Sequence, residues 1–207
     1  MKKLFRWYRD RVHFVDVFVR QAHPGECRGP YRSFEEKLES AREYRREEAI
    51  PWLVLVDDLA GTVHRAYGGM SDPAYLIDSL GRVAFYGMWA HAPTLKVAID
   101  QLLAMGGAGG PVAGGIDRFP HLFASFVNGW EGLKRGCDLA VRDYDVATLG
   151  GATLTRLGHL AKPVLAPLAL RAAPLPLGTK VAVSAALGAA LGLALGVRRR
   201  DHAGGGS

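Results

Sequence analysis

Residues 14–19 (FVDVFV) and the loop that follows them, residues 21–30 (QAHPGECRGP), decide how the first half of this chain is interpreted. The first stretch is β-branched and aromatic with almost no polar interruption, as expected for a strand that is buried on both faces. Residues 52–56 (WLVLV) have the same character. Between the two stretches, Ser33 and Glu36 have the spacing of a capping box, which predicts the start of a helix. The sequence therefore predicts two parallel strands joined by a helix.

The flanking segments complete an α/β domain over residues 1–105. Apolar residues at helical spacing predict a helix over residues 1–11, and no apolar run there is long enough for a signal peptide. A short helix over residues 61–67, a hairpin around the turn at 78–81 and a closing helix over 94–105 follow. This order is what a thioredoxin fold shows once its first strand is removed. We therefore expect an α/β, thioredoxin-like fold that lacks the first strand.

The stretch from 68 to 83 (GGMSDPAYLIDSLGRV) is a second feature that suggests a thioredoxin-like fold. It resembles the loop, proline, strand and turn of many thioredoxin-like reductases. The resemblance implies that Pro73 is a cis-proline that borders the active site. The alternative is a trans proline that opens an edge strand.

Further motifs in residues 1–105 resemble the iodothyronine deiodinase family and its bacterial relatives. The stretches that carry the resemblance are 18–24 (FVRQAHP), 32–35 (RSFE) with 40–42 (SAR), 54–57 (VLVD) and 66–68 (AYG). The resemblance implies an oxidoreductase with a thiol or selenol nucleophile, a thiol electron donor and no cofactor. It places His23 in the catalytic site.

The chain departs from the family pattern at three recognition positions. Gln21 stands where the family has a glutamate, and an amide can orient a group but cannot act as an acid or base at neutral pH. Tyr31 stands where the family has a histidine, and Trp89 falls near its arginine. Gln21 is kept with His23 as a catalytic candidate, while Tyr31, Pro73 and Trp89 are the candidate substrate-binding residues. The departures argue against recognition of thyroid hormone.

The nucleophile itself is the largest departure. In the family it lies at the start of the helix whose later part corresponds to residues 1–11, so it would fall upstream of Met1. We expect that the start of the protein is called too late and that the nucleophile is encoded upstream. The alternative is a non-catalytic thioredoxin-fold protein that binds a partner or acts as a membrane scaffold.

Cys27 is a second candidate nucleophile, because it lies a few residues after His23 in the same Gly- and Pro-rich loop. It would act as a peroxidatic or resolving thiol, or it is a loop cysteine of ordinary reactivity. The only other cysteine is Cys137. The spacing of the two suggests neither a metal site nor a disulfide framework.

The composition changes beyond residue 105. A Gly-rich linker at 106–118 leads to a helical segment at 119–178, which either lies along a membrane or packs on protein. Residues 179–200 are a candidate transmembrane helix, since they hold an uncharged apolar run followed by three arginines. A soluble apolar tail is the alternative.

The expected partners follow from that C-terminal region. Gly188, Gly192 and Gly196 form a small-residue stripe that would permit a homodimer in lipid. The formal net charge is +6, and the excess lies beyond Gly107, where it flanks apolar stretches. This pattern favours membrane lipid over nucleic acid as the partner. We expect a membrane-associated protein whose redox domain is cytoplasmic.

Overall fold

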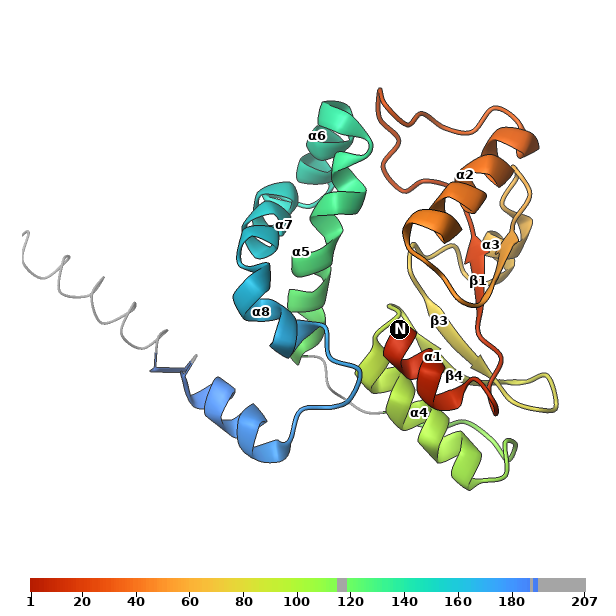
Figure 1. Cartoon of the computed structure of the whole chain (residues 1–207), viewed down its shortest axis with the longest axis vertical. Coiled ribbons are helices and arrows are strands. Elements are labelled where there is room, and N and C mark those ends of the chain that lie inside the picture. Colours follow the sequence, from red (N-terminus) through yellow and green to blue (C-terminus); the bar gives the residue numbers. More distant parts are fainter. Residues whose placement is uncertain (115–118, 187, 190–207) are drawn as a thin grey trace, which may run out of the picture. The chain divides into compact units, whose positions relative to one another are not determined.

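The structure is a computed structural model that describes residues 1–114, 119–186, 188 and 189. The chain divides into two compact units, Met1–Ala173 and Pro174–Ser207, which are considered separately. The first part of the first unit follows the predicted order of helices and strands (Figure 1). Its elements are α1 (Lys2–Tyr8), β1 (Val15–Phe18), α2 (Phe34–Glu47), β2 (Leu53–Val56), α3 (Thr62–Ala66), β3 (Ala74–Ile77), β4 (Val83–Gly87) and α4 (Ala92–Ala104).

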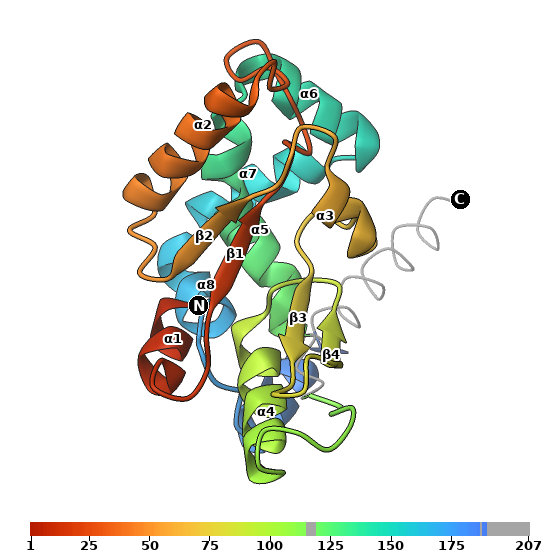
Figure 2. The same cartoon turned by 90° about the vertical axis from the view of Figure 1, so that its right-hand side faces the viewer.

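The strands of this unit form two separate pairs, which Figure 2 shows from the side. β1 and β2 are parallel, with Val15 opposite Leu53, as the sequence predicts. β3 and β4 form the predicted antiparallel hairpin, with an irregularity after Leu76. Among the described residues each pair is a separate two-stranded sheet. The prediction of a thioredoxin-like fold, in which the strands share one sheet, is therefore wrong. The crossover through α2 specifies the pairing of β1 with β2, and the tight turn specifies the pairing of β3 with β4. Neither connection specifies that the two pairs join into one sheet.

The main hydrophobic core lies between α1, the β3–β4 hairpin and α4. Its buried members are Leu4, Tyr8, Leu76, Ala84, Leu95, Ala98, Ile99 and Leu102. The β1–β2 pair has no comparable burial, because Val15, Val17, Leu53 and Leu55 are between 40% and 54% exposed. The expectation that both strands are buried on both faces is therefore wrong.

Helix α2 is attached to the β1–β2 pair by polar contacts and by the ring contact of Tyr44 with Phe18. The predicted capping box is present: the Ser33 hydroxyl accepts from the Glu36 N–H at 3.1 Å, and the Glu36 carboxylate accepts from the Arg32 N–H at 2.8 Å. The buried Lys37 donates from Nζ to the Asp58 carbonyl at 2.9 Å. The Tyr44 hydroxyl donates to Oδ2 of Asp16 at 3.2 Å. The bonds of Lys37 and Tyr44 attach α2 to the segment after β2 and to β1.

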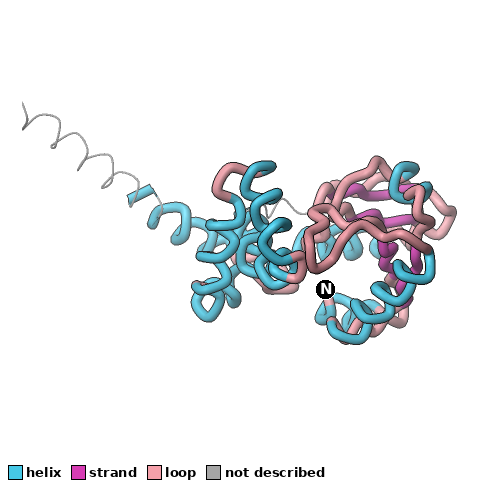
Figure 3. Tube along the Cα trace, turned by 90° about the horizontal axis from the view of Figure 1, so that it is seen from above, coloured by secondary structure: helices cyan, strands magenta, loops and turns pink. Residues whose placement is uncertain are grey.

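The described part of the segment after the Gly-rich stretch forms helices joined by short loops and contains no strand (Figure 3). It contains α5 (Phe119–Lys134), α6 (Cys137–Ala147), α7 (Gly151–Leu160) and α8 (Lys162–Ala169). α5 packs against α7 and α8. A Cβ at Gly158 would lie 2.8 Å from the backbone of Phe126, so a glycine is needed where these helices approach. Helix–helix packing buries Val127 of α5, whereas Leu154, Leu157, Leu160 and Val164 of α7 and α8 are 49–80% exposed.

The expected membrane-associated C-terminal region is not supported. Within the part of the chain that the structure describes, no helix has the length and apolar character needed to cross a membrane. Residues 177–186, 188 and 189 are helical, and Gly188 is exposed. Most of the candidate span at 179–200, with Gly192 and Gly196, lies outside the described residues.

Candidate functional site

The loop between β1 and α2 carries most of the site residues that the sequence singles out. Gln21, His23, Cys27 and Tyr31 all lie on it. The loop is folded back on itself, since the Gly25 N–H donates to the carbonyl of Arg28 at 2.9 Å. The structure therefore brings these candidates together in one place.

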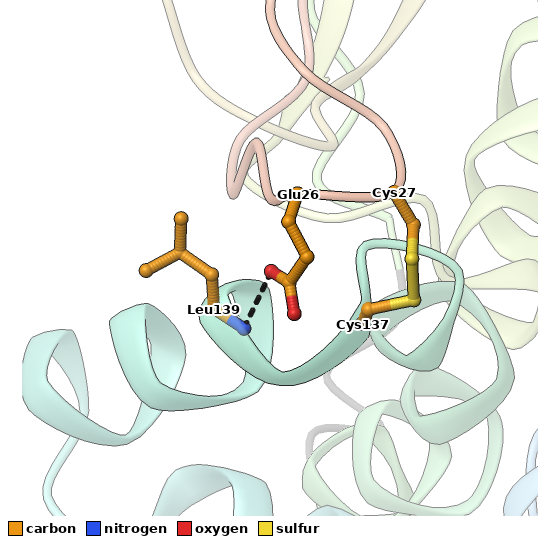
Figure 4. The surroundings of a disulfide bond; sticks show 4 residues. All are labelled: Glu26, Cys27, Cys137 and Leu139. Atoms are coloured by element: carbon orange, nitrogen blue, oxygen red, sulfur yellow. Dashed lines mark hydrogen bonds between the residues drawn. A yellow bond between two sulfur atoms is a disulfide. The ribbon is translucent and has the colours of Figure 1, made fainter.

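A disulfide joins Cys27 on this loop to Cys137, the first residue of α6 (Figure 4). The sequence suggested no disulfide. Because Cys27 is bonded to Cys137, the prediction of a free Cys27 thiol is wrong for this structure. The two cysteines are 110 residues apart, and such a separation carries no pairing signal in a single sequence. Cys27 is exposed and Cys137 is partly buried.

The bridge is part of a larger contact between the loop and the start of α6. Glu26 accepts a hydrogen bond from the Leu139 N–H at 2.8 Å, as Figure 4 shows. Hydrogen bonds from the N–H groups of Glu26 itself, Leu139 and Asp138 keep the pKa of this carboxyl below its ordinary value. A Cβ at Gly25 would overlap the carbonyl of Gly136, so the two backbones are in direct contact.

His23 is held by α6 rather than by another part of the loop. Its Nδ1 lies 2.7 Å from Oδ2 of Asp143, and its ring makes an edge contact with Tyr144 at 5.1 Å between centroids. The His23 side chain is 28% exposed and that of Asp143 is 53% exposed. A carboxylate that holds one ring nitrogen fixes the orientation of an imidazole. His23 is thus an oriented group at the junction of loop and helix.

Two cavities lie beside the loop. The first, of about 180 Å³, is formed by the loop, α2 and the turn between α5 and α6. The second, of about 280 Å³, reaches the bridge and is lined by Gln21, Cys27, Arg28, Gly29, Tyr31, Glu36 and Ser40. Oε1 of Gln21 is buried and has no hydrogen-bond partner. Burial raises the pKa of Tyr31, against the opposing effects of Ser40 and Arg28 nearby.

The other two candidate substrate-binding residues lie elsewhere. Pro73 and Trp89 line neither of these cavities. The described residues contain no cis peptide bond, so the expectation of a cis bond before Pro73 is wrong. Pro73 directly precedes β3, an edge strand of the hairpin, which is the alternative that the sequence left open.

Sequence reasoning missed the residues that α6 contributes. Asp143 lies 120 positions from His23, and Cys137 was given no role. Only the even number of cysteines pointed toward a pair. Among the residues that the structure describes, no group of three or more His, Cys, Asp or Glu side chains could hold a metal ion.

Comparison of the chain with protein-family models, with curated proteins and with solved structures gives no match. Its function is therefore argued from the geometry of the loop, the bridge and the adjoining cavities.

Proposed function

We propose that this chain is a thiol-dependent oxidoreductase, the class that the resemblance to deiodinases predicts, and that its redox-active group is the Cys27–Cys137 disulfide. The observation that carries the proposal is an exposed half-cystine, Cys27, that lines a cavity and is paired with a half-cystine at the start of a helix. An incoming thiolate can approach an exposed residue, which is the first requirement for exchange.

The reaction is a two-electron thiol–disulfide exchange. A thiolate attacks Sγ of Cys27, a bond forms between the two sulfurs, and the bond to Sγ of Cys137 breaks. Cys137 leaves as a thiolate and takes a proton from water. A second thiolate then attacks the external sulfur of the mixed disulfide, which releases an external disulfide and leaves Cys27 reduced. Two thiols are oxidised and the protein disulfide is reduced.

Cys137 is suited to be the leaving group. It is the first residue of α6, where the aligned peptide dipoles favour a thiolate. Its φ of +62° lies in a region that residues other than glycine rarely adopt, at a cost of about 1–3 kcal/mol. The carboxylate of Glu26 acts against a thiolate here, because it occupies the same helix start.

His23 acts as a positioning residue in this proposal. Its ion pair with Asp143 holds the loop against α6, so that the two cysteines meet again when the dithiol is reoxidised. His23→Gln should slow reoxidation, because the loop loses its contact with Asp143. The rate of Cys27 alkylation in the reduced chain should stay the same, whereas loss of the fold would change it.

We place the chain in the cytoplasm, where disulfides are usually transient and either catalytic or redox-sensing. A small thiol is the proposed electron donor. A deiodinase-like mechanism whose nucleophile lies outside residues 1–207 stays a separate proposal, and it predicts no redox activity for the 207-residue chain.

The test is the dithiothreitol-driven reduction of 2-hydroxyethyl disulfide, followed by chromatography of the product thiol. The 207-residue chain should raise the rate, and both Cys27→Ser and Cys137→Ser should abolish the increase. An increase that survives Cys27→Ser would show that Cys27 is not the nucleophile. No increase with the intact chain would overturn the proposal.

A non-catalytic binding or scaffold protein is the second candidate. It is favoured by the number of polar contacts that accompany the bridge, including those of Glu26 with Leu139 and of Arg135 with Glu48. These contacts are what a structural staple would have. A bridge that stays closed in excess dithiothreitol while the chain is folded would support this candidate.

A further inference from the structure

We propose that the outer face of α7 and α8 is a docking surface for an acidic amphipathic helix of a partner protein. The surface is defined by Leu154, Leu157 and Leu160 of α7 and by Val164 of α8. The inference goes beyond the proposed redox function, because these two helices carry neither half-cystine of the bridge.

The side chains that define this surface are apolar and exposed. Leu154 is 49% exposed, Leu157 56%, Leu160 67% and Val164 80%. Single apolar side chains on a surface need no explanation, but a contiguous exposed patch can mark a site of interaction. These four follow one another along two consecutive helices, so they form a patch and not isolated exposures.

The opposite side of α7 is already packed. Gly151, Ala152, Thr155 and Gly158 are buried, and α5 packs against both α7 and α8, as Figure 1 shows. Turning α7 to bury its leucines would place larger side chains against α5, where a Cβ at Gly158 would already lie 2.8 Å from Phe126. Packing against α5 therefore holds the leucines on the outer side.

The spacing of the exposed leucines fits a helix as the occupant. Leu154, Leu157 and Leu160 recur every three residues, and residues three or four apart on a helix form the ridges that pack into the grooves of another helix. The 10 residues of α7 span about 15 Å, which corresponds to roughly three turns of a partner helix. A bound helix would supply apolar anchors at the matching spacing.

The charge around the surface sets the chemistry of the partner. From residue 146 to residue 173 the chain has no Asp or Glu, whereas Arg156, Lys162 and Arg171 are cationic. A helix with Asp or Glu beside its apolar stripe would be attracted to such a surface. A second copy of the same surface would be repelled, so the charge favours an acidic partner over a homodimer.

The carboxylates that contact α7 from neighbouring helices do so through buried or partly buried residues. Asp145 accepts a hydrogen bond from the N–H of the buried Ala152 at 2.8 Å. Oε1 of Glu131 lies 3.1 Å from Nε2 of the partly buried His159. The guanidinium of Arg156 instead lies over the ring of Trp130, a contact that does not neutralise its charge.

An anionic membrane surface would match the same cationic residues, but the composition of the two helices favours a protein. Helices that lie in a membrane interface combine Trp or Phe anchors with a polar face rich in Lys and Arg. α7 (GATLTRLGHL) and α8 (KPVLAPLA) contain no Phe, Tyr or Trp, and each has a single Lys or Arg. A partner helix needs neither feature.

The experiment measures the binding of a labelled synthetic peptide to the full chain by fluorescence anisotropy. The probe is a three-heptad amphipathic helix with leucine at the a and d positions and glutamate at e and g, where the like charges also keep the peptide from pairing with itself. A second peptide has lysine in place of glutamate. The glutamate peptide should bind about tenfold more tightly than the lysine peptide, and added salt should weaken its binding.

Two variants and two matched controls locate the binding surface. Leu157→Ala removes an apolar anchor and should weaken binding of the glutamate peptide about fivefold. Lys162→Gln removes one charge and should weaken it several-fold, with a smaller salt dependence. Leu80→Ala on the β3–β4 turn, where the side chain is 68% exposed, and Lys3→Gln on α1 should leave binding unchanged. Circular dichroism checks that each variant is folded.

The possible outcomes are distinct. No binding of the glutamate peptide, or binding that survives Leu157→Ala, would overturn the inference. Tighter binding to vesicles of equal parts phosphatidylcholine and phosphatidylserine that depends on Leu157 would overturn it in favour of a membrane surface. Self-association in analytical ultracentrifugation that depends on Leu157 would overturn it in favour of a second copy. Thiol exchange at the bridge should be the same in Leu157→Ala, so either proposal can fail without the other.

Discussion

The core around α4 and the site around the β1–α2 loop are held together in different ways. The core buries eight side chains from α1, β3, β4 and α4 against one another. The site joins its loop to α6 through a disulfide, an ion pair and hydrogen bonds. The core does not depend on redox state, because apolar burial is unaffected by thiols. The site does depend on it.

The free-energy contributions of the contacts at the site show how strongly it depends on the disulfide. The ion pair of His23 with Asp143 and that of Arg135 with Glu47 are partly exposed, and such pairs contribute about 0–1 kcal/mol each. A disulfide that closes a loop of 110 residues contributes about 4–5 kcal/mol in the chain-entropy model. In that model the bridge contributes more to the free energy of unfolding of the chain than the ion pairs beside it do.

The largest expected effect is that of removing the bridge. The Cys27→Ser/Cys137→Ser double variant should lower the free energy of unfolding by about 4–5 kcal/mol relative to the oxidised chain. Urea denaturation measures the change, and hydrogen exchange should show faster opening at the start of α6. A loss below about 1 kcal/mol would contradict a bridge that restrains the unfolded chain.

The next effect is a cavity in the core. Ile99 is 4% exposed, and Ile99→Ala should lower the free energy of unfolding by about 3 kcal/mol. The loss should be the same in the chain with and without the cysteines, because Ile99 belongs to the core of α1, β3, β4 and α4, whereas the bridge joins the β1–α2 loop to α6. A loss that depends strongly on redox state would remove the distinction between core and site.

A smaller effect is expected from Gly25→Ala. The added Cβ would overlap the carbonyl of Gly136, and the overpacking should cost about 1–3 kcal/mol in the oxidised chain. In the variant without cysteines the loop can move away, so the cost should nearly vanish. Urea denaturation of the four chains gives the coupling. Equal costs in both backgrounds would place the contact outside the influence of the bridge.

The smallest effect is the pH dependence that Asp78 gives to the β3–β4 hairpin. Hydrogen bonds from the Arg82 N–H, the Arg82 guanidinium and the Leu80 N–H hold the pKa of this carboxyl below its ordinary 3.8. Its contribution to stability is therefore complete above about pH 4 and is lost as the pH falls through the folded-state pKa.

Comparing the wild type with Asp78→Asn tests whether the contribution of Asp78 to stability decreases as the pH falls. The difference in urea midpoint between the two chains should be larger at pH 7 than at pH 3. A difference that stays constant or grows on acidification would contradict it.

The local elements of the fold could be predicted from the sequence because each has a local cause. The capping box of Ser33 and Glu36, the turn around Asp78 and the parallel pairing of β1 with β2 are all present. The prediction that all the strands join into one sheet was wrong. Which strands lie side by side depends on tertiary contacts, and local sequence patterns do not specify those contacts. The prediction of a membrane-spanning helix is not supported for the described residues, in which no helix is long and apolar enough to cross a membrane.

The sequence predicted the loop residues of the site but not their partners on α6, for a similar reason. Gln21, His23, Cys27 and Tyr31 stand out because they cluster in a Gly- and Pro-rich loop after a strand. Their partners Cys137 and Asp143 lie on a helix more than a hundred residues later, and nothing in the local sequence connects them. Long-range pairs of this kind become visible only when the chain is folded.

The central claim is that Cys27 and Cys137 form a bridge that opens and closes reversibly in the folded chain. Equilibration of the chain in mixtures of reduced and oxidised dithiothreitol, followed by alkylation and peptide mass spectrometry, tests it directly. We expect one reversible two-electron transition in which Cys27 and Cys137 are modified together while circular dichroism keeps its helical signal. Cysteines that are alkylated independently of each other, or a bridge that opens only when the chain unfolds, would contradict the account.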